Sequence, residues 1–350
     1  MKLASILHAG KPLVVAEVDE ARVVPVDALA ALASGEGALS APAPLDDMLR
    51  VIALPPAELA LLSGALERLR RGESTAATIR ADAVTWRPPV PRPGKICAVA
   101  MNNSASNERK ISAPDHPAFF LKPASCLVGH LEPIRVRPYY GSVHPEPELA
   151  AVIGRPARDL DVDDALDAVF GYTIFDDVTS NGMRAEDRFH YYAVYASEEN
   201  PDETVRVEQH LSYAGRYKGS DTFGAMGPWL VTHDEVPDPD DLAVVCKAGG
   251  ETIADDSTRY YNYEVAEVVS FISQFLTLEP GDVISFGTAF KPGSTRKSIH
   301  HANLQRIPGP IEITIEGLGT LSNPVILEQR ELGRWRRASA AKHNRGTSKI

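Results

Sequence analysis

Apolar positions along the chain follow two different periods, and the helical period is confined to three segments. Leucines recur every three or four positions over residues 56–70, which predicts an amphipathic helix there. A similar apolar stripe predicts a helix over residues 263–276, with Asn262 as its N-cap. A short helix is expected over residues 163–169, because two aspartates place negative charge in its first turn.

Short apolar runs separated by proline and glycine turns make up most of the remaining chain, and they predict β-strands. The predicted strands lie at residues 13–18, 21–25, 96–100, 118–121, 134–136, 149–153, 171–175, 229–231, 242–247, 283–286 and 311–315. Many short strands with few helices are typical of a sandwich or barrel. We therefore expect a mainly β (α+β) fold.

A proline-rich segment predicts a domain boundary. Residues 86–94 hold four prolines, so this segment is expected to be extended and not helical. We expect a small N-terminal α+β domain over residues 1–90 and a larger β-rich domain over residues 91–328. A basic tail follows over residues 329–350.

Charge and cysteine usage limit the partners and the compartment. The formal net charge of −11 argues against nucleic acid or an anionic membrane surface as a partner. No apolar run approaches the 18 or more residues of a membrane span. Cys97, Cys126 and Cys246 lie far apart and form no disulfide framework, which favours the reducing cytoplasm. The sequence therefore predicts a cytoplasmic protein without a nucleic-acid or membrane partner.

Carboxylates at the ends of two apolar strands are the most informative polar positions. Glu146 and Glu148 are two residues apart, and alternate residues of an extended segment share a face. Two carboxylates this close repel each other unless a cation or a proton lies between them. The second strand ends in Asp176 and Asp177, either of which can supply a third ligand. Three hard oxygen ligands suit Mg²⁺, Mn²⁺ or Ca²⁺ better than a structural zinc.

Seven strings in one order resemble the fumarylacetoacetate hydrolase family. They lie at residues 119–125 (with Val128-Gly129), 146–154, 169–178, 218–223, 227–232, 277–288 and 315–324. The resemblance covers about residues 95–325, and residues 1–90 are similar to the family's small N-terminal domain. It implies a catalytic core of rolled mixed β-sheet, a homodimer and one divalent cation, Mg²⁺ or else Mn²⁺ or Ca²⁺.

The resemblance also implies roles for particular residues. Glu146, Glu148 and Asp177 would be the metal ligands, so the family pattern selects Asp177 over Asp176. Lys218 resembles a lysine that assists at the substrate carbonyl or enolate oxygen. The backbone around Gly287 and Thr288 resembles the contact to the substrate carboxylate. A solvated loop lysine and a simple strand-to-loop turn are the alternative interpretations of these last two features.

The chain departs from the family at the position of its water-activating histidine. Hydrolytic members carry a motif close to Asn-Tyr-x-x-His, whereas this chain has Asn103 in place of the tyrosine and Ser106 in place of the histidine. A serine hydroxyl is no base at neutral pH without a partner. The arginine that often follows the metal aspartate is also missing, with Asn181 in its place and Arg184 three residues on.

Another residue is therefore a candidate for the catalytic base. His300 or His301 lies close in sequence to the expected substrate end, and Arg296 in the same tract is a candidate anion clamp. An exposed basic loop is the alternative for this tract. His190 is a further candidate base, and otherwise part of an aromatic packing cluster.

These features predict a metal-dependent enzyme for a small 2-oxo or β-diketo carboxylate, of the acylpyruvate kind met in aromatic catabolism. A cation chelated by two substrate oxygens stabilises an enolate when a neighbouring bond breaks. Our first expectation is a C–C bond hydrolase. A lyase or isomerase is the alternative, because decarboxylation, dehydration and enol–keto isomerisation need no activated water. A non-catalytic ligand-binding paralogue is the third interpretation.

Overall fold

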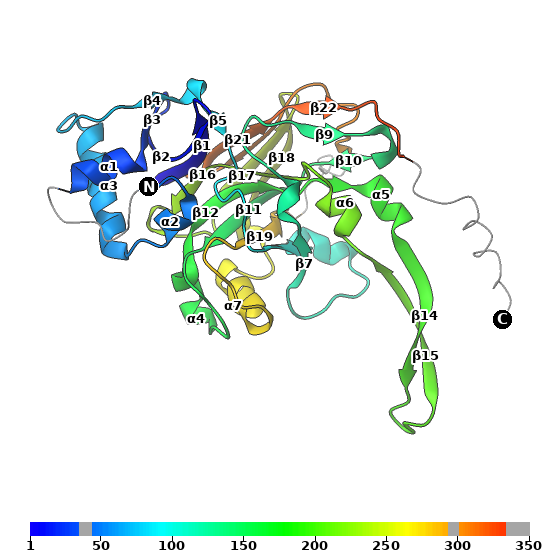
Figure 1. The fold of residues 1–350 in the computed structure, drawn as a ribbon. Coiled ribbons are helices and arrows are strands. Elements are labelled where there is room, and N and C mark those ends of the chain that lie inside the picture. Colours follow the sequence, from blue (N-terminus) through cyan, green and yellow to red (C-terminus); the bar gives the residue numbers. More distant parts are fainter. Residues whose placement is uncertain (35–43, 293–300, 334–350) are drawn as a thin grey trace.

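The chain is built around one long mixed β-sheet, seen in a computed structural model that describes residues 1–34, 44–292 and 301–333 (Figure 1). Its main path runs β4-β3-β2-β1-β16-β12-β11-β19-β6-β7, with β5 paired to β1 and β8 to β16. Neighbours on this path are antiparallel, except β19 and β6, which are parallel. The mainly β fold expected from the sequence is confirmed.

The strands of this sheet lie far apart in the sequence, between residues 2 and 288. They are β1 (Lys2–His8), β2 (Lys11–Asp19), β3 (Arg22–Pro25), β4 (Ile79–Arg80), β5 (Thr85–Trp86), β6 (Ile96–Ala100), β7 (Ala118–Lys122), β8 (Leu127–Val128), β11 (Pro147–Ile153), β12 (Val169–Asp176), β16 (Gly224–Thr232) and β19 (Val283–Thr288). Because β1 pairs with β16, residues of the expected N-terminal domain continue the sheet of the larger unit.

Smaller sheets and short helices complete the fold. A four-stranded sheet, in the order β18-β17-β20-β21, consists of β17 (Ala243–Ala248), β18 (Glu251–Ser257), β20 (Ile311–Ile315) and β21 (Gly319–Asn323). Three two-stranded sheets pair β9 (Ile134–Val136) with β22 (Val325–Leu327), β10 (Val143–His144) with β13 (Thr179–Ser180), and β14 (Arg188–Ala196) with β15 (Thr204–Ser212). The α-helices are α1 (Val26–Ala33), α2 (Met48–Ile52), α3 (Pro56–Arg70), α4 (Val162–Ala165), α5 (Asn181–Glu186), α6 (Gly215–Gly219) and α7 (Val265–Phe275). The 3₁₀ helices are η1 (Ala81–Ala83), η2 (Ser104–Arg109), η3 (Ala124–Cys126), η4 (Pro138–Tyr140), η5 (Leu166–Ala168), η6 (His233–Glu235) and η7 (Thr258–Tyr260).

Strands β11 and β12, at the centre of the sheet, are buried on both faces, which explains their continuous apolar sequences. In β11, Leu149 and Ala151 belong to one core cluster and Ala150 and Val152 to another. The first cluster also holds residues of the four-stranded sheet and of α7, whereas the second holds residues of α1, α2 and α3. Apolar layers on both sides therefore hold β11 and β12 in place. In the part of the chain that the structure describes, no helix is long and apolar enough to cross a bilayer.

Two of the three expected helices have different ends from those predicted. Helix α3 begins and ends as expected, but residues 163–169 divide into α4, η5 and the start of β12. The predicted cap Asn262 is wrong for α7, which begins at Val265. The backbone N–H of Glu264 donates to the Glu267 carboxylate at 2.8 Å, so a capping box starts the helix instead.

Strands β14 and β15 form a long hairpin, which we call the arm, and the predicted strands did not include it. The arm projects away from the body of the protein, and its strands pair only with each other (Figure 1). The sequence treated its first strand as a possible aromatic packing cluster, but most of its aromatic side chains are exposed, among them Phe189, Tyr191, Tyr192 and Tyr195. A buried aromatic cluster at this position is therefore wrong.

Candidate active site

Three carboxylates converge at one end of the two central strands. Glu146 directly precedes β11, Glu148 lies within it, and Asp177 directly follows β12. The antiparallel register places Pro147 opposite Asp176, so the start of one strand lies beside the end of the other. Oxygen atoms of Glu146, Glu148 and Asp177 all lie within 4.8 Å of one another. The pairing of these strands therefore brings together residues that are about thirty positions apart in the sequence.

Glu148 is buried, and two other carboxylates, those of Glu146 and Asp177, lie beside it. Its Oε2 accepts a hydrogen bond from the Ser285 hydroxyl and one from the backbone N–H of Gly287 at 3.2 Å. Burial raises the pKa of Glu148 well above its ordinary value, and the neighbouring carboxylates of Asp177 and Glu146 raise it further. A cation beside Glu148 would relieve this repulsion.

Glu146 lies in a more favourable environment for a carboxylate. The Asn181 amide lies 3.3 Å from His144 Nδ1, and His144 Nε2 lies 3.0 Å from Glu146 Oε1. Donation by the amide fixes the tautomer in which Nε2 donates to the carboxylate. The Thr179 hydroxyl donates to the same oxygen at 3.1 Å. Burial raises the pKa of Glu146, but Lys218 and His144 outweigh burial and hold it well below its ordinary value.

Asp176 has a different position from Asp177. Its Oδ1 accepts a hydrogen bond from the backbone N–H of Glu146 at 2.8 Å. Asp176 therefore positions the backbone that carries the Glu146 side chain. Its Oδ2 is buried and has no hydrogen-bond partner among the described residues. Burial raises the pKa of Asp176 to about 7, despite the bond from Glu146. The geometry therefore places Asp177, and not Asp176, in the group of three.

Two lysines neutralise part of this charge. Lys218 Nζ donates to Glu146 Oε2 at 2.7 Å and to Asp177 Oδ2 at 2.5 Å. Burial lowers the pKa of Lys218, but the carboxylates of Asp177, Glu146 and Glu148 raise it above its ordinary value. Lys122, whose side chain is fully buried, pairs with Asp177 Oδ1 and donates to the Phe223 carbonyl at 3.0 Å and to the Lys218 carbonyl. Both lysines therefore hold positive charge beside the carboxylates.

A cavity of about 330 Å³ opens onto these groups. It is lined by Val99, Ala100, Met101, Asn103, Phe120, Glu146, Glu148, Arg184, Tyr217, Lys218, Thr288 and Phe290. A larger cavity of about 550 Å³ lies between the N-terminal helices and the far end of β12, and none of these carboxylates lines it. The smaller cavity is the better candidate, because charged groups converge on it.

The remaining predicted site residues lie in several places. Thr288 lines the cavity, and the N–H of Gly287 binds Glu148. His301 is exposed, and neither it nor His190 belongs to the described lining of the cavity. His190 lies on the arm. Arg296 and His300 lie outside the described residues, and so does the Ser106 side chain, although its backbone belongs to η2.

The donor set fits a hard divalent cation. Three carboxylates at the ends of two strands offer oxygen ligands. Burial, and after it the carboxylates of Asp177 and Glu146, raise the pKa of Glu148, and a cation would offset both effects. The same site has room for substrate, because Glu146 and Glu148 also line the cavity. Glu146, Glu148 and Asp177 are therefore the residues that could hold Mg²⁺ or Mn²⁺.

Sequence reasoning gave no role to three residues that contribute to the site. Lys122 ends the apolar strand β7, and a lysine in such a strand is the signal that could have found it. Arg184, whose guanidinium lies 5.9 Å from the centre of the Tyr217 ring, lines the cavity and supplies a cation near the position where the family's arginine is missing. His144 orients Glu146 and lies only two residues before it.

Comparison with known proteins gives the same family over the same part of the chain. The family described as "Fumarylacetoacetate (FAA) hydrolase C-terminal" matches residues 95–326. An oxaloacetate tautomerase from Bos taurus, FAHD2A, is 30% identical over 288 residues, which are 79% of this chain and 84% of that protein. Protein Rv2993c from Mycobacterium tuberculosis is 33% identical over 61% of this chain and 68% of its own length.

Solved structures agree with this assignment. A maleylpyruvate hydrolase from Sphingobium sp. SYK-6, in complex with manganese(II) and pyruvate, has a TM-score of 0.66 and 26% identity. A 5-carboxymethyl-2-hydroxymuconate delta-isomerase from Mycobacterium smegmatis has a TM-score of 0.61 and 26% identity. In both comparisons 94% of this chain and 100% of the other are covered. The carboxylate geometry and these matches lead to one conclusion: this chain belongs to the fumarylacetoacetate hydrolase family.

Proposed function

We propose that this protein is a divalent-metal-dependent enzyme that forms the enolate of a small 2-oxo or β-diketo carboxylate. The observation that carries the proposal is the convergence of Glu146, Glu148 and Asp177 beside the cavity that Lys218 lines. A bound Mg²⁺ or Mn²⁺ would supply positive charge that stabilises developing negative charge on substrate oxygens. Manganese(II) in the structurally similar maleylpyruvate hydrolase supports a divalent cation.

Residues of this chain account for the rest of the binding site. The ammonium of Lys218 lies 5.4 Å from the centre of the Phe120 ring at the cavity wall, where it can donate to a substrate oxygen. Arg184 offers a guanidinium, which suits a substrate carboxylate because its fork donates two parallel hydrogen bonds. Thr288 and Asn103 add neutral polar side chains. With a divalent cation held by Glu146 and Glu148, the cationic side chains of Lys218 and Arg184 would favour an anionic substrate.

Among reactions of such an enolate, enol–keto isomerisation is the one this cavity supports best. No histidine belongs to the described lining of the cavity, and Ser106 stands at the position of the family's histidine. Isomerisation moves a proton between carbon and oxygen and requires no activated water. The Bos taurus relative is an oxaloacetate tautomerase, and the Mycobacterium smegmatis neighbour is an isomerase.

C–C bond hydrolysis, the first expectation from the sequence, is the second candidate. The maleylpyruvate hydrolase with a TM-score of 0.66 is a hydrolase in complex with manganese(II) and pyruvate, which is a 2-oxo acid. In this chain the base would then come from the segment around His300, which lies outside the described residues. Decarboxylation and dehydration are further reactions of the same enolate.

One assay separates these reactions. Purified protein with Mg²⁺ or Mn²⁺ is given the enol form of oxaloacetate, and the loss of enol absorbance is followed while CO₂ is measured. The same protein is given an acylpyruvate, and release of a second carboxylic acid is measured. The proposal predicts faster enol decay without CO₂ or acyl cleavage, and loss of this activity with excess EDTA.

Two variants make the assay specific to the site. Glu148→Gln removes a carboxylate from the group of three and should abolish the activity, whereas Glu251→Gln changes an exposed glutamate of β18 and should leave it intact. Acyl cleavage without enol decay would establish the hydrolase and reject the isomerase. Full activity with EDTA present would reject both, because each depends on the cation.

A further inference from the structure

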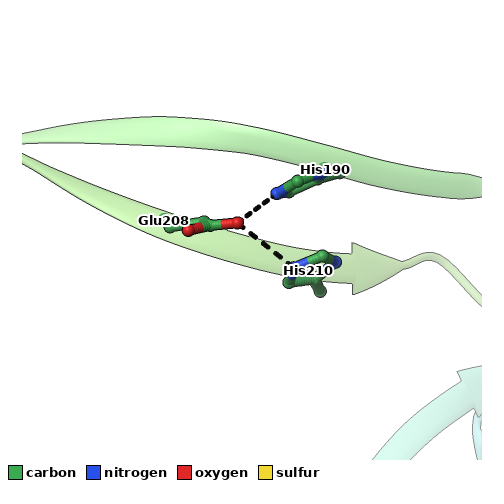
Figure 2. A group of neighbouring side chains, drawn as sticks. All are labelled: His190, Glu208 and His210. Carbon is green, nitrogen blue, oxygen red and sulfur yellow. Dashed lines mark hydrogen bonds and ion pairs between the residues drawn. The ribbon is translucent and has the colours of Figure 1, made fainter.

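The arm carries a second group of candidate ligands, separate from the cavity. His190 on β14 lies directly opposite His210 on β15 in the antiparallel register, and Glu208 precedes His210 by two residues. Directly opposite residues of paired strands share a face, and so do residues two apart on one strand. All three side chains therefore project from one face of the arm (Figure 2).

The three side chains already meet around one carboxylate oxygen. Glu208 Oε1 lies 2.5 Å from His190 Nε2 and 3.7 Å from His210 Nε2 (Figure 2). His190 and Glu208 therefore form a hydrogen bond, whereas His210 lies too far from the carboxylate to form one. The imidazole rings stack with centroids 4.0 Å apart and planes inclined by 15°. Ligand atoms of all three residues lie within 4.8 Å of one another.

The chemistry of these donors differs from that of the three carboxylates in the cavity. Two imidazole nitrogens and one carboxylate oxygen form the ligand set that Zn²⁺ takes with a water in the fourth position. Imidazole also suits Ni²⁺ and Cu²⁺, whereas Mg²⁺ and Ca²⁺ prefer oxygen ligands alone. We propose that His190, Glu208 and His210 bind a zinc-class divalent transition-metal ion on the arm.

Such an ion would link the two strands of the arm, because it would bind side chains from both β14 and β15. In the described structure the arm is a two-stranded sheet, and an isolated hairpin is only marginally stable in water. Because the ligands come from both strands, the ion binds the paired arm better than the separated strands. Binding therefore stabilises the pairing by an amount that grows with the free ion concentration.

Equilibrium dialysis of the untagged full-length protein against Zn²⁺ tests the proposal. Saturating Mg²⁺ is present to occupy the carboxylates of the cavity, and the Glu148→Gln variant is measured in parallel to identify zinc bound there. We expect one Zn²⁺ per chain that is retained in Glu148→Gln. Cys97, Cys126 and Cys246 are all buried and compete poorly.

Matched histidine variants then assign the site. His190→Gln and His210→Gln should each weaken this zinc binding by about tenfold or more, because each removes one of three ligands. His233→Gln, which replaces an exposed histidine outside the arm, should bind as the unmodified protein does. Circular-dichroism spectra and urea denaturation midpoints equal to those of the unmodified protein would show that the arm variants fold.

A structural measurement accompanies the dialysis. Zn²⁺ should slow amide hydrogen exchange in residues 188–212 of the unmodified protein but not of His190→Gln. Equal zinc affinity in the unmodified protein, His190→Gln, His210→Gln and His233→Gln would overturn the proposal. Half an ion per chain, with a doubled molecular mass, would replace it with a site shared between two copies.

Discussion

At the residue scale, two of the site's three carboxylates pair with lysines among the described residues, and Glu148 does not. Lys122 and Lys218 pair with Glu146 and Asp177, and burial together with the two neighbouring carboxylates raises the pKa of Glu148. Alternate positions of an extended segment predicted Glu146 and Glu148 on one face, and the family resemblance chose Asp177 over Asp176. The sequence could not predict the ion pair from Lys122, since that contact depends on how β7 lies beside the end of β12.

Lys122 should be the more important of the two lysines for stability. Lys122→Met leaves an oxygen of the buried Asp177 carboxylate without its ion pair, and losing one partner of a buried pair costs about 3–5 kcal/mol. Lys218→Met should lower the free energy of unfolding by less, because Lys218 lines the cavity, where water can replace it. Urea denaturation of both variants measures this difference. Equal losses would show that burial of Lys122 does not decide its contribution.

His130 should make stability depend on pH. Its Nδ1 accepts a hydrogen bond from the backbone N–H of Ser322 at 3.0 Å, and its ring lies edge-on to Trp86. Burial lowers its pKa from 6.5 to about 4, so the folded protein prefers the neutral ring. Below pH 6.5 the unfolded chain binds a proton that the folded protein does not. This contribution to stability is therefore complete above pH 6.5 and is lost as the pH falls to about 4.

The loss should reach about 3 kcal/mol near pH 4, since one pKa unit corresponds to about 1.4 kcal/mol. His130→Asn keeps a hydrogen-bond acceptor but cannot take up the proton. Its free energy of unfolding should therefore depend less on pH between 6.5 and 4 than that of the unmodified protein. Urea denaturation at several pH values tests this, and parallel curves for the two proteins would contradict the role of His130.

At the scale of elements, local patterns predicted best where packing and sequence period agree. Helix α3 begins and ends as its leucine spacing predicts, because one face packs on the sheet. Its counterpart α7 begins later than predicted, since Asp240 accepts from the Val265 N–H at 2.9 Å and Glu267 completes the cap. The first of these contacts comes from a residue 25 positions away. No local pattern at Asn262 could reveal it.

The arm was missed for a different physical reason. Its two strands pair only with each other in the described structure and leave side chains on both faces exposed, so no buried face gives them an alternating pattern. Hairpin pairing places His190 opposite His210, which the spacing of twenty residues alone does not predict.

At the scale of the whole molecule, one sheet joins the two units that the proline-rich segment suggested. Strand β1 pairs with β16, and β5, at residues 85–86, also pairs with β1. Pairings between residues more than two hundred positions apart carry no local signal, so the sequence predicted strands without their order. The division into a small N-terminal domain and a larger domain, the homodimer and the cytoplasmic location stay predictions.

The whole-molecule account depends on one site, because the fold brings the start of β11 and the end of β12 to the same cavity. Those strand ends supply the three carboxylates, and the family relatives include enzymes with different reactions. In our proposal all of these reactions depend on a divalent cation. Binding of that cation by the three carboxylates is therefore the central claim of the proposal.

Titration calorimetry with Mn²⁺ tests this claim most directly. It is performed in the His190→Gln background, so that the arm does not contribute. We expect one Mn²⁺ per chain, unchanged by Glu251→Gln and weakened by about tenfold or more by Glu148→Gln, which removes a carboxylate ligand. The same Mn²⁺ affinity with and without the Glu148 carboxylate would contradict the account.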